Sequence, residues 1–190
     1  MIESQRQLFL MSFPNSSSDE EWVVRTIKLS QRLFRAAQRK ARWLRLAQSL
    51  GMKRQPMLAL DEMSLPDRRS SHDLPGVQAV AIDKILGSEN RCTDFDGEFL
   101  PLKNHLESRW MTITALMLQS QPLPAVELIQ VGEAYFVRDG HHRISAARCL
   151  GQRHIDAHIT VWTTSDGAPV QTARELGALD SNFASLAGRV

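Results

Sequence analysis

A strand-to-helix transition over residues 134–151 constrains the fold of this chain more than any other segment. The apolar run AYFVR leads into Asp139-Gly140 and then into HHRISAARCLG, whose apolar residues recur at helical spacing. Gly140 permits a sharp turn between the two elements, and Gly151 is a typical helix stop. The segment therefore predicts a strand that turns directly into a helix.

The start of this predicted helix is suited to binding an anion. The first N–H groups of a helix lack backbone partners, and the helix dipole places positive charge there. Arg143 offers a planar fork of donors and Ser145 a hydroxyl, while the two histidines offer donors expected to switch near neutral pH. We predict a phosphate-binding site at this position. Its candidate ligands are Gly140, His141, His142, Arg143 and Ser145.

Asp139 has several alternative roles at this helix start. It is a candidate helix cap, a candidate magnesium ligand and a candidate general base. An ordinary capped helix, in which Arg143 pairs with Asp139 or another carboxylate, is the alternative to a phosphate site. Two adjacent histidines do not make a metal site without a third ligand, so no metal centre is predicted from protein ligands.

The polar loop ENRCTDFDGE, residues 89–98, supplies further candidates. Arg91 is a candidate phosphate ligand, Asp94 a candidate magnesium ligand or base, and Glu89 a candidate base. Turn chemistry is the alternative explanation, because Asp96-Gly97 is a typical turn pair.

Residues 21–50 contain neither glycine nor proline and predict one long helix. Its basic residues recur at steps of three and four and so form a single stripe: Arg25, Lys28, Arg32, Arg35, Arg39 and Arg42. Three interpretations are open: a solvated helix whose apolar face packs on the core, a nucleic-acid surface, or a surface for a membrane or an acidic partner helix.

Composition divides the remaining chain into four segments. We expect a polar leader over 1–20, a connector over 51–76 with one ordered piece at Leu58–Met63, a folded core over 77–162 and an accessory tail over 163–190. Within the core, strands are predicted over 77–82, 125–131, 134–138 and 154–162, a short turn over 83–88 and a helix over 99–120.

With 43% hydrophobic and 23% charged residues, the 190-residue chain is not a disordered protein, and a net charge of +2 does not indicate a wholly basic nucleic-acid binder. Two cysteines are too few for a disulfide framework. The sequence shows no signal peptide and no apolar run of about 18 residues, so we expect a cytoplasmic protein with free thiols and no membrane span.

The stretch from Val77 to Val161 resembles the N-terminal domain of the ParB/sulfiredoxin superfamily. The order of elements matches, with an opening strand, an arginine-containing loop, a helix, the run PAVELIQVGEAYFV, and then DGHHRISAARCLG and IDAHITV. Gly140 matches the glycine of that family's Gly-Glu-Arg-Arg box and Arg143 its last arginine, while His141 and His142 replace the residues between them.

The resemblance implies an α+β fold: a ParB/sulfiredoxin-like core of a small mixed sheet with packed helices, here preceded by the long basic helix. It also implies a bound nucleotide, CTP or ATP/ADP, used with Mg²⁺ in the kinases of this fold, and a homodimer is one option. The nucleophilic cysteine of sulfiredoxins aligns with His141, so sulfiredoxin activity is not expected. Only 28 residues follow residue 162, which is too few for the DNA-reading and dimerisation domains of a complete partitioning protein.

We therefore expect a protein that binds nucleotide phosphates at Gly140–Arg143, with an NTPase or small-molecule kinase step left open. The alternative is a non-enzymatic, DNA-associated regulatory module that binds nucleic acid through residues 21–50. A nuclease is disfavoured because the sequence shows no carboxylates with two-metal spacing.

Overall fold

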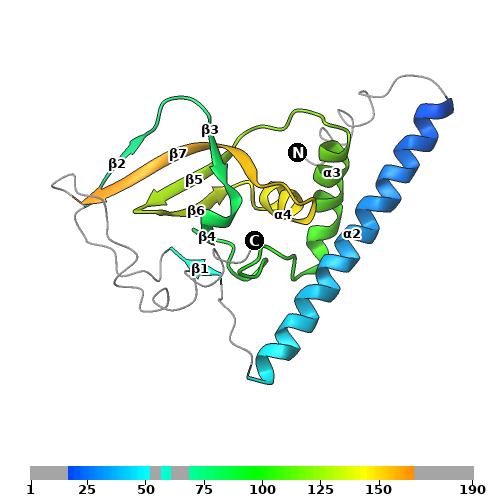
Figure 1. The fold of residues 1–190 in the computed structure, drawn as a ribbon, viewed down its shortest axis with the longest axis horizontal. Helices are drawn as coiled ribbons and strands as arrows, with labels where there is room; N and C mark the ends of the chain where they lie inside the picture. The colour runs from blue at the N-terminus through cyan, green and yellow to red at the C-terminus, as the bar shows by residue number, and fades with distance from the viewer. Residues whose placement is uncertain (1–16, 52–56, 61–68, 165–190) are drawn as a thin grey trace, which may run out of the picture.

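The computed structural model describes residues 17–51, 57–60 and 69–164. These ranges form an α+β fold in which helices pack on a mixed seven-stranded sheet, as the sequence predicted (Figure 1). The predicted leader and tail lie outside the described residues, except for residues 17–20 and 163–164. Element labels follow Figure 1.

The sheet has the order β1-β4-β6-β5-β7-β2, with β3 also paired to β7. Its strands are β1 (Leu58–Ala59), β2 (Arg69–Asp73), β3 (Gln78–Ala81), β4 (Ile85–Ser88), β5 (Val126–Val131), β6 (Ala134–Asp139) and β7 (His154–Thr164). The pairs β1–β4, β4–β6 and β5–β7 are parallel, and the other pairs are antiparallel. The predicted hairpin turns at Gly132, where β5 pairs antiparallel with β6.

Strand β7 organises one half of this sheet. One edge pairs with β5, while the other pairs with β3 along residues 154–157 and with β2 along residues 160–164. The predicted alternation along β7 is confirmed, because Ala157 and Ile159 are buried in the core while His158 between them is exposed.

The helices are α2 (Ser17–Ser49), α3 (Glu107–Leu118) and α4 (His141–Cys149), with short 3₁₀ turns at Ile82–Lys84 and Asn104–Leu106. Helix α2 lies diagonally against α3, which in turn packs against α4 (Figure 1). Phe34 of α2 meets the buried ring of Trp110 of α3, with ring centroids 5.5 Å apart. This contact fixes α2 to the core by its apolar face.

Three local predictions were wrong. Arg69–Asp73, assigned to the polar part of the connector, forms β2, and most of the predicted turn over 83–88 forms β4. By contrast, β1 begins the ordered piece predicted at Leu58–Met63. The predicted helix over 99–120 begins only at Glu107, because Pro101 forms an isolated bridge with Phe95 instead of a first helical turn.

None of the helices in the described ranges has a stretch long and apolar enough to cross a membrane. Cys149 is a free thiol, as predicted, and the Sγ–H of Cys92 donates to the carbonyls of Leu58 at 3.6 Å and Ser88 at 3.7 Å.

Candidate functional site: an arginine-lined cavity at the start of helix α4

Gly140 joins β6 to α4 in a conformation that favours glycine. Its φ of 103° and ψ of 16° lie in the left-handed region, and an added Cβ would stand 2.5 Å from Cγ1 of Val126. Gly140 is itself the N-cap residue of α4, and no side chain caps the helix. The predicted capping role of Asp139 is therefore wrong, because Asp139 is the last residue of β6.

A cavity of about 220 Å³ lies at this helix start. Four segments line it: the loop after β4, the outward side of α3, the end of β6 and the first turn of α4. Its lining residues are Asn90, Arg91, Arg109, Ile113, Arg138, Asp139, Gly140, His141, His142 and Arg143. The lining has four arginines and one carboxylate, and Asp94 and Glu89 pair with Arg91 and Arg138 from outside it, so the wall carries a net positive charge. With the helix dipole adding to this charge, the cavity favours an anion.

Arg143 is largely occupied by contacts within the protein. Its guanidinium donates to the carbonyls of Pro124 and Ala125, the latter at 2.9 Å, and to Oδ2 of Asp139 at 2.6 Å. Its side chain is 12% exposed, whereas that of Asp139 is 57% exposed. Arg143 thus ties the segment before β5 to the start of α4, which is the structural alternative raised by the sequence.

The two histidines are buried and neutral, contrary to the expectation that they switch near neutral pH. Burial lowers the pKa of His141 and of His142 to about 4; the charge of Arg91 acts in the same direction on both, and that of Arg109 on His142. Both rings pack on Phe95, His141 stacked at 6.0 Å and His142 edge-on at 5.4 Å between centroids. Nδ1 of His142 is buried without a hydrogen-bond partner among the described residues.

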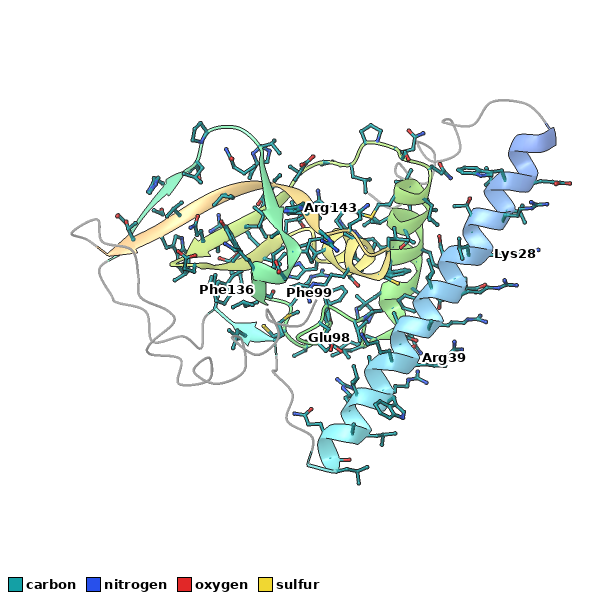
Figure 2. All side chains as sticks on the ribbon, in the orientation of Figure 1. Lys28, Arg39, Glu98, Phe99, Phe136 and Arg143 are labelled. Carbon is teal, nitrogen blue, oxygen red and sulfur yellow. The ribbon has the colours of Figure 1, made fainter. Side chains whose placement is uncertain are left out.

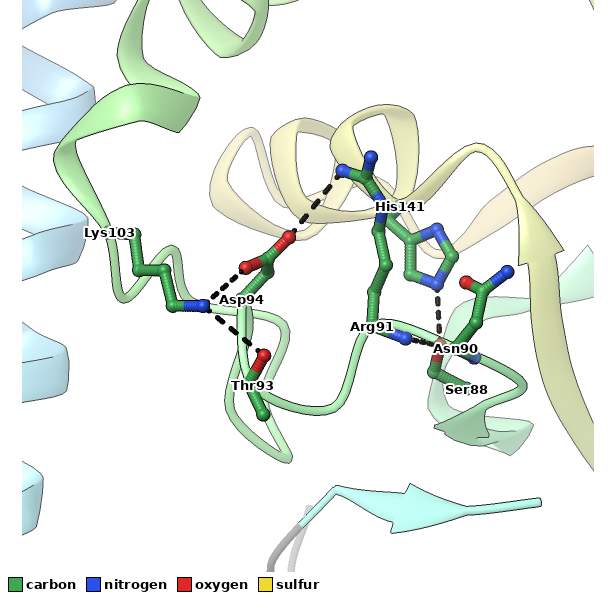
Figure 3. A network of polar contacts seen from close by, with 7 residues as sticks. All are labelled: Ser88, Asn90, Arg91, Thr93, Asp94, Lys103 and His141. Atoms are coloured by element: carbon green, nitrogen blue, oxygen red, sulfur yellow. Dashed lines mark hydrogen bonds and ion pairs between the residues drawn. The ribbon is translucent and has the colours of Figure 1, made fainter. Parts of the chain in front are cut away.

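One buried hydroxyl connects the loop carrying Arg91 to α4 (Figure 3). Ser88 Oγ accepts the backbone N–H of Asn90 at 3.2 Å and that of Arg91 at 3.0 Å, and it lies 2.7 Å from Nε2 of His141. Because two N–H groups occupy its lone pairs, the hydroxyl proton is directed to His141. His141 is therefore the neutral tautomer with its proton on Nδ1. Ser88 is fully buried and is not placed as a nucleophile.

The three carboxylates proposed as bases all form ion pairs with lysine or arginine side chains. Asp94 accepts from Lys103 at 2.9 Å and pairs with Arg91 at 3.6 Å (Figure 3). Burial raises the pKa of Asp94, but Lys103 and Arg91 outweigh burial, so its pKa is lowered. Glu89 pairs with Arg138 at 3.3 Å. Of the three, only Asp139 lines the cavity.

Ser145 does not line the cavity, although it belongs to the first two turns of α4. It is buried, and its oxygen accepts a hydrogen bond of 2.8 Å from the indole N–H of Trp110. Its place is therefore in the contact between α3 and α4.

Sequence reasoning missed Arg109, Arg138 and Asn90. Arg138 carried a local signal, because it immediately precedes the Asp139-Gly140 turn. Arg109 carried none, because only the packing of α3 against α4 brings it to the cavity. Within the described residues, no three His, Cys, Asp or Glu side chains gather in a way that could hold a metal ion.

The basic stripe of α2 lies apart from this cavity. Its six residues are all exposed, while Thr26, Ser30, Phe34, Ala37 and Ala41 on the other side of the helix are buried. Figure 2 shows Lys28 and Arg39 extending away from the core. The predicted docking of an apolar face is confirmed at Phe34, Ala37 and Ala41, whereas Ile27, in line with them at a step of seven, is 38% exposed.

Comparisons with known proteins give little further information. No family model matches this chain, and no curated protein matches it. Among solved structures, the chain is similar to sulfiredoxin from Arabidopsis thaliana, with 20% sequence identity and a TM-score of 0.35, over 45% of this chain and 84% of the other. That protein bears the name of the superfamily that the sequence resembles, but a similarity this low assigns neither ligand nor activity to this chain.

Proposed function

We propose that this protein binds the phosphate chain of a nucleotide in the cavity at the start of α4. The observation that carries the proposal is the convergence of four arginines on one helix N-terminus. Arg91, Arg109 and Arg138 come from three different segments, so the fold itself gathers the charge. A helix start and guanidinium groups are both complementary to phosphate oxygens.

The arginines differ in how free they are to meet a ligand. Arg109 is exposed and forms no ion pair with the described residues. Arg91 and Arg138 are 41% and 38% exposed, and their acid partners lie at 3.6 and 3.3 Å, longer than a tight ion pair. These three are the proposed phosphate ligands, while Arg143 shapes the wall and contributes charge.

The volume of the cavity limits what it encloses. Drug-sized ligands occupy pockets of about 300–1,000 Å³, and this cavity has about 220 Å³. It therefore fits the phosphate chain, with the base and ribose outside it. We propose binding without a catalytic step, because Asp94, Glu89 and Asp139 each pair with a lysine or arginine side chain and none is a free base. Should Mg²⁺ accompany the nucleotide, Asp139 is the carboxylate positioned to contact it.

Calorimetric titration with CTP, ATP, ADP and tripolyphosphate tests this function. Arg109→Ala and Arg138→Ala are each expected to weaken binding by about tenfold to a hundredfold, the effect of losing one charged hydrogen bond. Arg153→Ala is the control, because Arg153 is exposed and does not line the cavity. Arg143→Ala is unsuited, because it also releases Pro124 and Ala125.

Equal affinity in Arg109→Ala, Arg138→Ala and Arg153→Ala would contradict the assignment of the cavity. Absence of binding by all four compounds to the unaltered protein would contradict the function itself.

A second candidate function is nucleic-acid binding by α2. The favouring observation is that the basic stripe faces solvent along about 25 Å of helix, at 1.5 Å per residue from Arg25 to Arg42. Among the described ion pairs, only the exposed Arg25–Glu21 pair at 3.7 Å engages the stripe. A row of cations at this spacing suits the phosphates of duplex DNA.

Duplex DNA binding measured between 50 and 200 mM salt tests the second candidate. Neutralising Arg32, Arg35 and Arg39 to Gln is expected to reduce the slope of log K against log salt by about 2.7, or 0.9 per lost phosphate contact. The control neutralises Lys84 and Arg153, which are exposed elsewhere. No binding at the lowest salt would exclude this candidate.

A further inference from the structure

A second cavity, of about 340 Å³, lies beside the first. It is formed by the end of α3, the segment that leads to β5, the residues after α4 and the beginning of β7. Its lining residues are Met117, Ser120, Gln121, Leu123, Pro124, Arg143, Gln152, His154, Ile155 and Asp156. Nothing in the proposed phosphate site uses this cavity apart from Arg143.

Two observations show that the two cavities are adjacent. Arg143 lines both of them. The outward face of α3 also continues from one to the other, because Arg109 and Ile113 line the first cavity and Met117 and Ser120 line the second. Arg109, Ile113 and Met117 follow one another by one helical turn each and span about 12 Å along the helix, and Ser120 lies two residues past the end of α3.

The two cavities differ in chemistry. The first has a net positive charge, because four arginines line it and only three of them pair with a carboxylate. The second is lined by one arginine, Arg143, and one carboxylate, Asp156, and its other polar groups include the amides of Gln121 and Gln152. Met117, Leu123, Pro124 and Ile155 add apolar surface. One end of the site thus suits an anion, and the other suits an uncharged group with both apolar faces and hydrogen-bonding edges.

We propose that the second cavity holds the nucleoside of the ligand whose phosphate chain occupies the first. This inference rests on the proposed phosphate-binding function and extends it. Apolar side chains would contact the face of the base, and the two glutamine amides, each both donor and acceptor, would read its edge. Asp156 accepts from an amino or hydroxyl group. Arg143, tied to Pro124 and Asp139, forms the boundary between the two halves.

The test compares nucleotides with tripolyphosphate, which has no nucleoside. The unaltered protein is expected to bind CTP or ATP more tightly than tripolyphosphate. The double variant Gln121→Ala/Gln152→Ala is expected to lose about tenfold in nucleotide affinity, the effect of two hydrogen bonds, and less than twofold in tripolyphosphate affinity. Both glutamines are exposed, so the fold is retained. Gln48→Ala, on the exposed side of α2, is the matched control.

The outcomes test the nucleoside cavity and the phosphate site separately. Tripolyphosphate binding as tight as nucleotide binding, or unchanged nucleotide affinity in the double variant, would overturn the nucleoside cavity while leaving the phosphate site in place. Failure of both tripolyphosphate and nucleotides to bind would overturn both.

Discussion

Gly140→Ala is expected to lower the free energy of unfolding by about 2–5 kcal/mol. A left-handed backbone costs an L-residue about 1–2 kcal/mol, and forcing an extra methyl into a packed core costs about 1–3 kcal/mol. The new Cβ would stand 2.5 Å from Cγ1 and 2.7 Å from Cβ of Val126, a fully buried residue of β5. The core therefore has to shift, and the helix start with it. Urea unfolding measures this loss.

Gly151→Ala is the matched control for this variant. Gly151 also has a left-handed φ, 74°, but an added Cβ would meet nothing within 4 Å. Its replacement is expected to lower the free energy of unfolding only by the cost of a left-handed backbone, about 1–2 kcal/mol. Equal losses in the two variants would show that close packing against Val126 does not determine the need for glycine at position 140.

Ser88→Ala is expected to lower the free energy of unfolding by about 2–3 kcal/mol and to increase the mobility of the loop that carries Arg91. The change removes the partner of two backbone N–H groups and of His141 Nε2 at once, and an unsatisfied buried polar group costs about 1–3 kcal/mol. Two measurements report on this: the free energy of unfolding, and the hydrogen-exchange rates of the Asn90 and Arg91 amides, which are expected to rise.

Ser70→Ala provides the comparison for Ser88→Ala. The Ser70 hydroxyl is also hydrogen-bonded, to Thr163 Oγ1 at 2.7 Å, but it is exposed and water replaces the lost partner. Its replacement is expected to change stability by less than about 0.5 kcal/mol. Unchanged exchange at Asn90 and Arg91 in Ser88→Ala would contradict the role given to the Ser88 hydroxyl.

The fold was predictable wherever local pattern and burial agree. The glycine-free run over 21–50, the hairpin at Gly132 and the alternation along β7 all appear as predicted. Strand β2 was not predictable, because RSSHD has no apolar residues and owes its conformation to backbone pairing with β7. Strand β4 is short and contains Gly87, whose position is set by contact with Leu58 and Phe136.

The candidate site was predictable where its residues are close in sequence. Asp139, Gly140, His141, His142 and Arg143 line the cavity together, because they span one strand-to-helix turn. The charge states of the histidines were not predictable, because they follow from burial against Phe95. Arg91 was found through its loop, whereas Arg109 reaches the cavity through tertiary packing alone.

The central place of β7 has a consequence for synthesis of the chain. This last described strand pairs with β2, β3 and β5, all of which precede it. Ribosomes add about 5–20 residues per second, so β2 and β3 emerge several seconds before β7. During that interval the segments of β2 and β3 lack the strand with which they pair. The backbone groups on one edge of β5 also lack partners until β7 is synthesised. Completion of the sheet is thus a late step, after most of the described residues have left the ribosome.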